Sequence, residues 1–195
     1  MPTFRKRTFT LSLLARSLLG AALYLPVLLV ALLRPTTSRA LREKVMLAVS
    51  AVNDCRYCNW VHTGLALANG VDLDDLKHVL EADTFGEVNG RDATAILFAR
   101  HFADTVRRPH AEARTALARE FSFGERLEIM AYINAIYFAN LSGNSGDAWL
   151  ARLRGLRVDD GHPLAEAIAA LAAAPFLLLI AALSRKSRRP KLDAL

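Results

Sequence analysis

Two cysteines and a histidine stand at a spacing that can carry redox chemistry. Cys55 and Cys58 form a C-x-x-C pair, and His62 follows four residues after the second cysteine. Residues three or four apart share one face of a helix, so we expect all three side chains to lie on a single stripe. The pair can close to a disulfide and reopen, while the imidazole takes or gives the proton of the neighbouring thiol. The spacing predicts a thiol redox site.

The place of the pair in its helix favours thiolate chemistry. Asp54 is predicted to be the N-cap residue, which puts Cys55 in the first helical turn. Unpaired backbone N–H groups and the helix dipole stabilise a thiolate there. A thiolate that attacks the O–O bond of a peroxide becomes a sulfenic acid, and a second thiol condenses with it to a disulfide. A cysteine pair at a helix start therefore suits two-electron peroxide reduction.

Glu43 lies twelve residues before Cys55, on the preceding predicted helix. If residues 53–54 make a tight turn, the two helices pack antiparallel, and an inward Glu43 could approach Cys58 and His62. A buried carboxylate beside an imidazole would hold the tautomer of the ring and accept a relayed proton. An ordinary solvated charge is the alternative interpretation of Glu43.

The pattern Glu43-x11-Cys55-x2-Cys58-x3-His62 resembles that of the AhpD-like alkylhydroperoxidases, which belong to the carboxymuconolactone decarboxylase superfamily. A later stretch, GERLEIMAYINAIYFANLSGNSGDAWLARLRG, is similar to the helix that follows the redox pair in the same superfamily. The resemblance covers residues 36–155.

The resemblance implies an all-helical and usually oligomeric thiol peroxidase. By position, Cys58 would be the peroxide-attacking thiolate and Cys55 its resolving partner, while His62 and Glu43 would form the proton relay. The implied partners are a hydroperoxide substrate and a dithiol electron donor, and no cofactor is expected. The decarboxylase branch lacks the cysteine pair, so decarboxylation is disfavoured. Where well-studied members carry a second histidine before the second cysteine, this chain has Tyr57.

Other interpretations stay open for the same residues. Cys55 and Cys58 could be inert buried thiols, or they could join His62 and Glu43 in a metal site. Structural zinc prefers four Cys or His ligands, so a single C-x-x-C knuckle is incomplete, and no metal is expected. The functional alternatives are a membrane-associated disulfide-exchange or redox-sensing module without peroxide turnover, and a non-enzymatic helical assembly unit.

Hydrophobic residues recur at helical spacing through the middle of the chain and predict an all-α fold. No alternating strand pattern of useful length occurs. Thr37 and Ser38 are good N-cap residues for the helix that contains Glu43, and Arg107 and Arg108 are expected to form a solvated turn before the next helix. The predicted helices cover residues 41–52, 55–68, 72–80, 95–102, 111–121 and 126–141, followed by a break at residues 143–146 and a short piece up to Leu153.

The 195-residue chain is 53% hydrophobic and 23% charged, which fits one domain with a sizeable core and excludes disorder and collagen-like repeats. Two cysteines cannot form a disulfide scaffold. The formal charge is +6, but eight of the 25 basic residues lie in two short tails, at residues 5–7 and 185–191. The stretch between the tails is nearly neutral, so no nucleic-acid partner is expected.

Each basic tail adjoins an uncharged apolar run, Ser17–Leu33 or Ala167–Ser184. Both runs are at the lower limit of what spans a hydrocarbon layer about 30 Å thick. Membrane contact is favoured over burial in the core or in a subunit interface, and a cleavable signal peptide is a further interpretation of the first run. The chain is divided into an apolar N-terminal helix (1–35), a helical core (36–160) and an apolar C-terminal helix with a basic tail (161–195). The expected location is cytoplasmic or membrane-associated.

Overall fold

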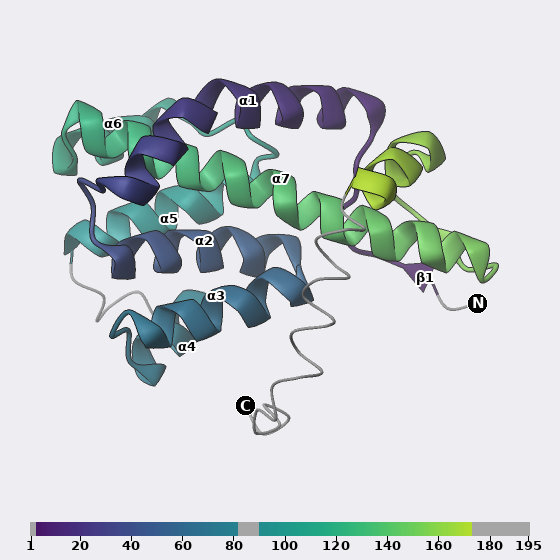
Figure 1. Ribbon diagram of the computed structural model, residues 1–195, viewed down its shortest axis with the longest axis horizontal. Coiled ribbons are helices and arrows are strands. Elements are labelled where there is room, and N and C mark those ends of the chain that lie inside the picture. The colour runs from purple at the N-terminus through teal and green to yellow at the C-terminus, as the bar shows by residue number, and fades with distance from the viewer. Residues whose placement is uncertain (1–2, 82–89, 173–195) are drawn as a thin grey trace. The chain divides into compact units, whose positions relative to one another are not determined.

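The computed structural model of the chain describes residues 3–81 and 90–172, and it confirms the predicted all-α class (Figure 1). Within these ranges the chain forms two compact units, a larger one of residues 12–141 and a smaller one of residues 3–11 and 142–172. Residues Pro163–Ala172 are helical. The other elements, in chain order, are β1 (Thr3–Phe4), α1 (Leu11–Leu33), α2 (Arg39–Asn53), α3 (Arg56–Ala68), α4 (Leu73–Glu81), α5 (Gly90–Asp104), α6 (Ala111–Glu120), α7 (Phe123–Leu153) and β2 (Arg157–Val158).

Helix α2 forms the centre of the larger unit and packs against α3, α4 and α5. Every residue from Glu43 to Ser50 is buried, so the helix has no solvated face along that stretch. Ser38 caps its N-terminus as predicted, because the Ser38 side chain accepts a hydrogen bond from the Leu41 amide at 3.0 Å. Charged side chains within the buried stretch therefore need partners inside the protein.

Ion pairs and capping contacts hold the neighbours of α2 in place. Lys44 Nζ lies 2.7 Å from a carboxylate oxygen of Asp75 in α4 and 3.3 Å from one of Asp92 in α5. Glu128 of α7 accepts hydrogen bonds from the amide and the hydroxyl of Thr37, at 3.0 and 2.9 Å. These contacts set where α2 begins and which helices lie beside it.

The predicted break at residues 143–146 is wrong, because α7 continues through this segment. Both of its glycines are buried. The polar residues between them bond to the N-terminal segment of the same unit: Ser145 Oγ accepts a hydrogen bond from the Phe9 amide at 3.0 Å, and the Asn144 side chain donates one to the Arg7 carbonyl at 3.2 Å. Tertiary partners thus satisfy residues that on their own favour a turn.

The smaller unit pairs β1 with β2 in parallel. Arg152, near the end of α7, donates two hydrogen bonds to the buried carboxylate of Glu166, at 2.5 and 3.1 Å. This pair ties the helical residues Pro163–Ala172 to α7. The predicted apolar run Ala167–Ser184 is helical as far as residue 172, and the rest of the run lies outside the described residues.

Helix α1 continues through Pro26, although proline removes one backbone donor from the helix. It is long and apolar enough to cross a membrane, by length and composition alone. A narrow face is buried, at Leu13, Ser17, Gly20 and Ala31. Only 17% of its most apolar window is buried, so α1 presents a broad apolar surface.

Candidate redox site

The turn between α2 and α3 places the cysteine pair. Asp54 has left-handed backbone angles, φ 50° and ψ 46°, and its amide donates to the carbonyls of Ala51 and Ser50. Asp54 therefore ends α2, and its predicted role as the N-cap of the next helix is wrong. Aspartate tolerates left-handed angles better than most residues do. From this turn α3 runs back alongside α2 (Figure 1).

Cys55 itself is the N-cap residue of α3. Its Sγ accepts a hydrogen bond from the Cys58 amide at 3.4 Å. The sulfur thus meets the N–H groups that have no partner within the helix, which is the electrostatic effect expected at a helix start. Cys55 and Cys58 form a disulfide, with their Cα atoms 5.4 Å apart.

The two cysteines differ in their access to solvent. Cys55 is fully buried, whereas Cys58 is only partly buried. A small molecule that arrives from solvent therefore meets the sulfur of Cys58 before that of Cys55.

The structure brings together Glu43 of α2 and His62 of α3. His62 Nδ1 and Glu43 Oε2 lie 2.7 Å apart. The other carboxylate oxygen of Glu43 accepts a hydrogen bond from Arg42 Nε at 2.8 Å. The side chain of Glu43 is 1% exposed, and those of His62 and Arg42 are each 15% exposed, so both contacts are largely shielded from water.

The surroundings of Glu43 keep its carboxylate ionised. Burial on its own raises the pKa of Glu43, but the hydrogen bonds and positive charges of His62 and Arg42 outweigh it and leave the pKa below its ordinary value. An ionised carboxylate accepts the Nδ1 proton of His62, which leaves Nε2 as the basic nitrogen of the neutral ring. Because His62 follows Cys58 by one turn of α3, this nitrogen belongs to the same helix face as the more accessible sulfur.

The contact of Arg42 with Glu43 is not predictable from the sequence. Neighbouring residues of a helix point in different directions, so no pattern links Arg42 to Glu43, and the contact arises because α2 is buried on all sides. The hydroxyl of Tyr57 accepts a hydrogen bond from Arg56 Nη2 at 2.6 Å. Among residues 3–81 and 90–172, no group of three or more His, Cys, Asp or Glu side chains is placed to hold a metal ion.

The fold and the site together define an all-helical protein with a cysteine pair at a helix start and a carboxylate–histidine pair between two helices. Residues 22–100 match the carboxymuconolactone decarboxylase family, and this region of the chain is similar to that family. Comparisons with curated proteins and with solved structures give no match.

The matched range differs from the expected range of 36–155. It begins inside α1, so the second half of the apolar helix is part of the family region, and it ends in α5. The helix α7 lies outside the match. All four predicted site residues lie within it, namely Glu43, Cys55, Cys58 and His62.

Proposed function

We propose that this protein is a thiol-dependent hydroperoxide reductase. The observation that carries the proposal is the combination of a Cys55–Cys58 disulfide at the start of α3 with the Glu43–His62 contact between α2 and α3, since His62 follows Cys58 by one turn of α3. In its reduced form the cysteine pair supplies two electrons to the peroxide, and the disulfide is its oxidised product. The second supplies a base whose orientation is set by a buried carboxylate. The similarity of residues 22–100 to a family that includes alkylhydroperoxidases agrees with this chemistry.

The proposed reaction begins on the reduced protein. His62 Nε2 takes the proton of the Cys58 thiol, and the thiolate attacks one oxygen of the hydroperoxide. The O–O bond breaks as the S–O bond forms, so that sulfur loses two electrons and Cys58 becomes a sulfenic acid. The departing alkoxide takes a proton from the imidazolium of His62 and leaves as an alcohol. Glu43 stays ionised throughout and stabilises the imidazolium.

The second half of the reaction closes the disulfide. The Cys55 thiol attacks the sulfenic sulfur of Cys58, the S–S bond forms, and the hydroxyl leaves as water with the proton of the Cys55 thiol. An external dithiol then returns two electrons and two protons by exchange and is itself released as a disulfide. The net reaction converts a hydroperoxide and a dithiol to an alcohol, water and a disulfide, without a cofactor.

Counting thiols tests this proposal. Reduced protein is treated with one equivalent of tert-butyl hydroperoxide, and free thiols are titrated before and after. We expect the wild type to lose both thiols, and a sulfenic acid to be trapped in Cys55→Ser. A sulfenic acid trapped only in Cys58→Ser would reverse the roles of the two cysteines. Survival of both thiols in the folded wild type would refute peroxidase activity.

A disulfide-exchange or redox-sensing module is the second candidate function. Tyr57, bonded to Arg56, stands where the resemblance leads one to expect a second histidine, and this difference favours the second candidate. Steady-state consumption of tert-butyl hydroperoxide with dithiothreitol as electron donor separates the two functions. Turnover supports the peroxidase, whereas exchange with dithiols in the absence of peroxide turnover supports the second candidate.

The exposed surface of α1 supports a proposal about partners. Large apolar side chains are exposed along the helix, with Val30 62% and Leu33 84% exposed. We propose that lipid covers this surface in a membrane-associated form, and that the protein is a homo-oligomer, as is usual in its superfamily. Co-sedimentation with phospholipid vesicles tests the first part, and light scattering of the detergent-free protein tests the second. A monomer that stays in the supernatant would contradict both.

A further inference from the structure

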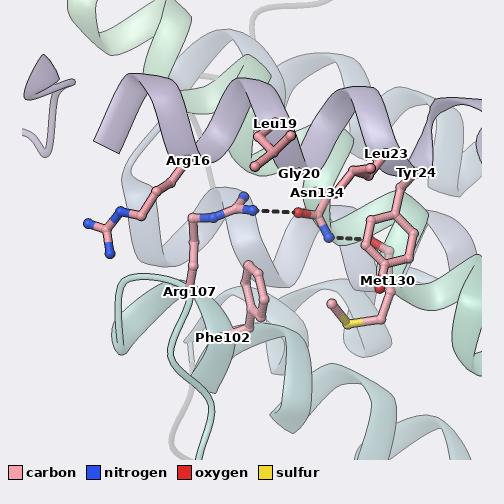
Figure 2. Close-up of a pocket in the computed structure, with 9 residues that line it drawn as sticks. All are labelled: Arg16, Leu19, Gly20, Leu23, Tyr24, Phe102, Arg107, Met130 and Asn134. Carbon is pink, nitrogen blue, oxygen red and sulfur yellow. Dashed lines mark hydrogen bonds between the residues drawn. The ribbon is translucent and has the colours of Figure 1, made fainter. Parts of the chain in front are cut away.

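A cavity of about 250 Å³ lies in the larger unit, and none of the four redox residues lines it. One face of α1 forms one side of the cavity. Phe102 of α5, Arg107 of the α5–α6 connection, and Met130 and Asn134 of α7 form the rest (Figure 2). We call this site the arginine cavity. The prediction of a solvated turn is therefore wrong at Arg107, because its side chain is partly buried in the cavity wall.

Arg107 is held in place but is not neutralised. Its Nη2 donates a hydrogen bond to Asn134 Oδ1 at 2.8 Å, while its buried Nη1 has no partner within the described structure. The guanidinium lies 5.5 Å from the ring centre of Phe102 and 5.6 Å from that of Tyr137. No carboxylate of the described residues forms an ion pair with it. A buried cationic donor without a partner is costly, and an anion that accepts from it would remove that cost.

The surroundings add a second positive charge and no negative one. The groups that act electrostatically on Arg107 are Tyr137, Arg16 and Tyr24. Arg16 is itself a lining residue of the cavity, although its guanidinium is directed away from Arg107 (Figure 2). The lining residues include no carboxylate, so the potential of the cavity favours anions.

The backbone of α1 is shaped around this guanidinium. Gly20 has no side chain, and a Cβ at this position would overlap Arg107 Nη2 and Asn134 Oδ1. The amide group of Asn134 is oriented by its own hydrogen bond, since Nδ2 donates to the Met130 carbonyl at 2.7 Å. This bond turns Oδ1 towards Arg107 (Figure 2). Arg107 is therefore a positioned group and not a freely moving surface arginine.

The rest of the lining is apolar, with Leu19 and Leu23 from α1 opposite Phe102 and Met130. We propose that the arginine cavity binds an amphipathic monoanion, namely a carboxylate that carries an unbranched apolar chain. The carboxylate accepts from the guanidinium of Arg107, and the chain lies along the leucines of α1. Ligand pockets usually measure roughly 300–1,000 Å³, so this smaller cavity suits a medium-length chain or the head end of a longer one.

Titration calorimetry with decanoate tests this inference on the full-length protein. We expect saturable binding of one decanoate per chain, together with binding weaker by about ten-fold or more for decanol, which lacks the charge, and for acetate, which lacks the chain. Decanol that binds as tightly as decanoate would overturn the proposal, because the arginine would then contribute nothing. Acetate that binds as tightly would overturn the role of the apolar lining.

Substitutions locate the site. Arg107→Met keeps the length of the side chain and removes its charge, so decanoate affinity should fall about ten-fold or more. Arg108→Gln removes the neighbouring, exposed charge and should leave the affinity unchanged. Arg107→Lys keeps a charge should Arg107→Met fail to fold, and it should bind more weakly than the wild type because it lacks the planar fork. Equal affinity in wild type, Arg107→Lys and Arg108→Gln would overturn the assignment to Arg107.

Discussion

The redox site and the arginine cavity each hold a charged side chain away from water, but they treat the charge differently. Glu43 has both carboxylate oxygens paired, one with His62 and one with Arg42. Arg107 has one nitrogen bonded to Asn134 and another that is buried without a partner in the described structure.

The two charges differ in what they are available for. The carboxylate of Glu43 is paired inside the protein and orients His62, whereas the guanidinium of Arg107 has a donor left for a ligand. A buried ion whose lone pairs are all satisfied is stable in its charged state and can orient a neighbour. A buried ion that is only half satisfied is a cost to the fold unless something binds it. Four measurements test whether the two charges differ in this way, and they follow in order of decreasing expected effect.

The largest effect is expected from replacing His62, the proposed general base of the redox site. His62→Asn removes the nitrogen that takes the Cys58 proton, so the rate of peroxide reduction at neutral pH should fall by about 10²–10⁴-fold. Stopped-flow measurement of peroxide consumption by the reduced protein gives this rate. His110→Asn is the matched control, because His110 is exposed and its side chain makes no capping hydrogen bond. A rate unchanged in His62→Asn would remove the histidine from the mechanism.

Removing the paired carboxylate should cost stability. Glu43→Ala leaves the partly buried guanidinium of Arg42 and the ring N–H of His62 without their acceptor, and breaking a buried pair from one side costs about 3–5 kcal/mol in free energy of unfolding. Urea unfolding of the oxidised protein measures the loss. The exposed Glu112 of α6 supplies the control, and Glu112→Ala should change stability by no more than about 0.5 kcal/mol. Similar losses in both variants would mean that the pair contributes nothing specific.

Part of the free energy of unfolding that Glu43 contributes should be lost at acidic pH. The pKa of Glu43 is below its ordinary value, so its contribution is fully present above the pKa of the unfolded chain and is lost as the pH falls through the folded pKa. Glu128 behaves in the same direction, because the hydrogen bonds from Thr36 and Thr37 outweigh the effect of burial on its pKa. Glu43→Gln should therefore flatten the acid limb of stability against pH without abolishing it. An unchanged acid limb would contradict the assignment to Glu43.

The smallest effect tests the arginine cavity in the absence of ligand. Gly20→Ala places a methyl group where Arg107 and Asn134 meet, and such overpacking typically costs about 1–3 kcal/mol. Gly124→Ala is the matched control, because a Cβ at Gly124 of α7 meets no atom within 4 Å. Alanine favours the helix over glycine, so the control should be neutral or slightly more stable. Equal stability of the two variants would show that Arg107 moves freely.

The local sequence pattern was sufficient to predict most of the helices and the cysteine pair. The helical spacing after Ser38 predicts α2, and the Ser38 cap is confirmed. The predicted end of the next helix at residue 68 is also confirmed, since α3 ends at Ala68 and Gly70 that follows has φ 84°. These features depend on residues within one or two turns of each other, which is the range over which periodicity and capping act.

Features that depend on distant residues were predicted wrongly or not at all. The segment 143–146 carries turn-forming residues, yet it stays helical because the backbone of Arg7 and Phe9 supplies its partners. Asp54 looked like an N-cap, but the reversal between α2 and α3 needs a left-handed residue, and Asp54 takes that role instead. At residues 143–146 long-range hydrogen bonds outweigh the local preference for a turn, and at Asp54 the reversal that packs α3 against α2 outweighs the preference for an N-cap.

The sequence by itself determined that this is an all-helical chain with a C-x-x-C pair followed by a histidine on the same helix face, because spacing along a helix is enough to decide this. Only the tertiary structure decided that Glu43 meets His62 and Arg42, and that Arg107 lies against Gly20 and Asn134. The physical reason is burial. A charge that is removed from water must find its partner wherever the packing of other helices places one, and that place is not encoded in the residues next to it.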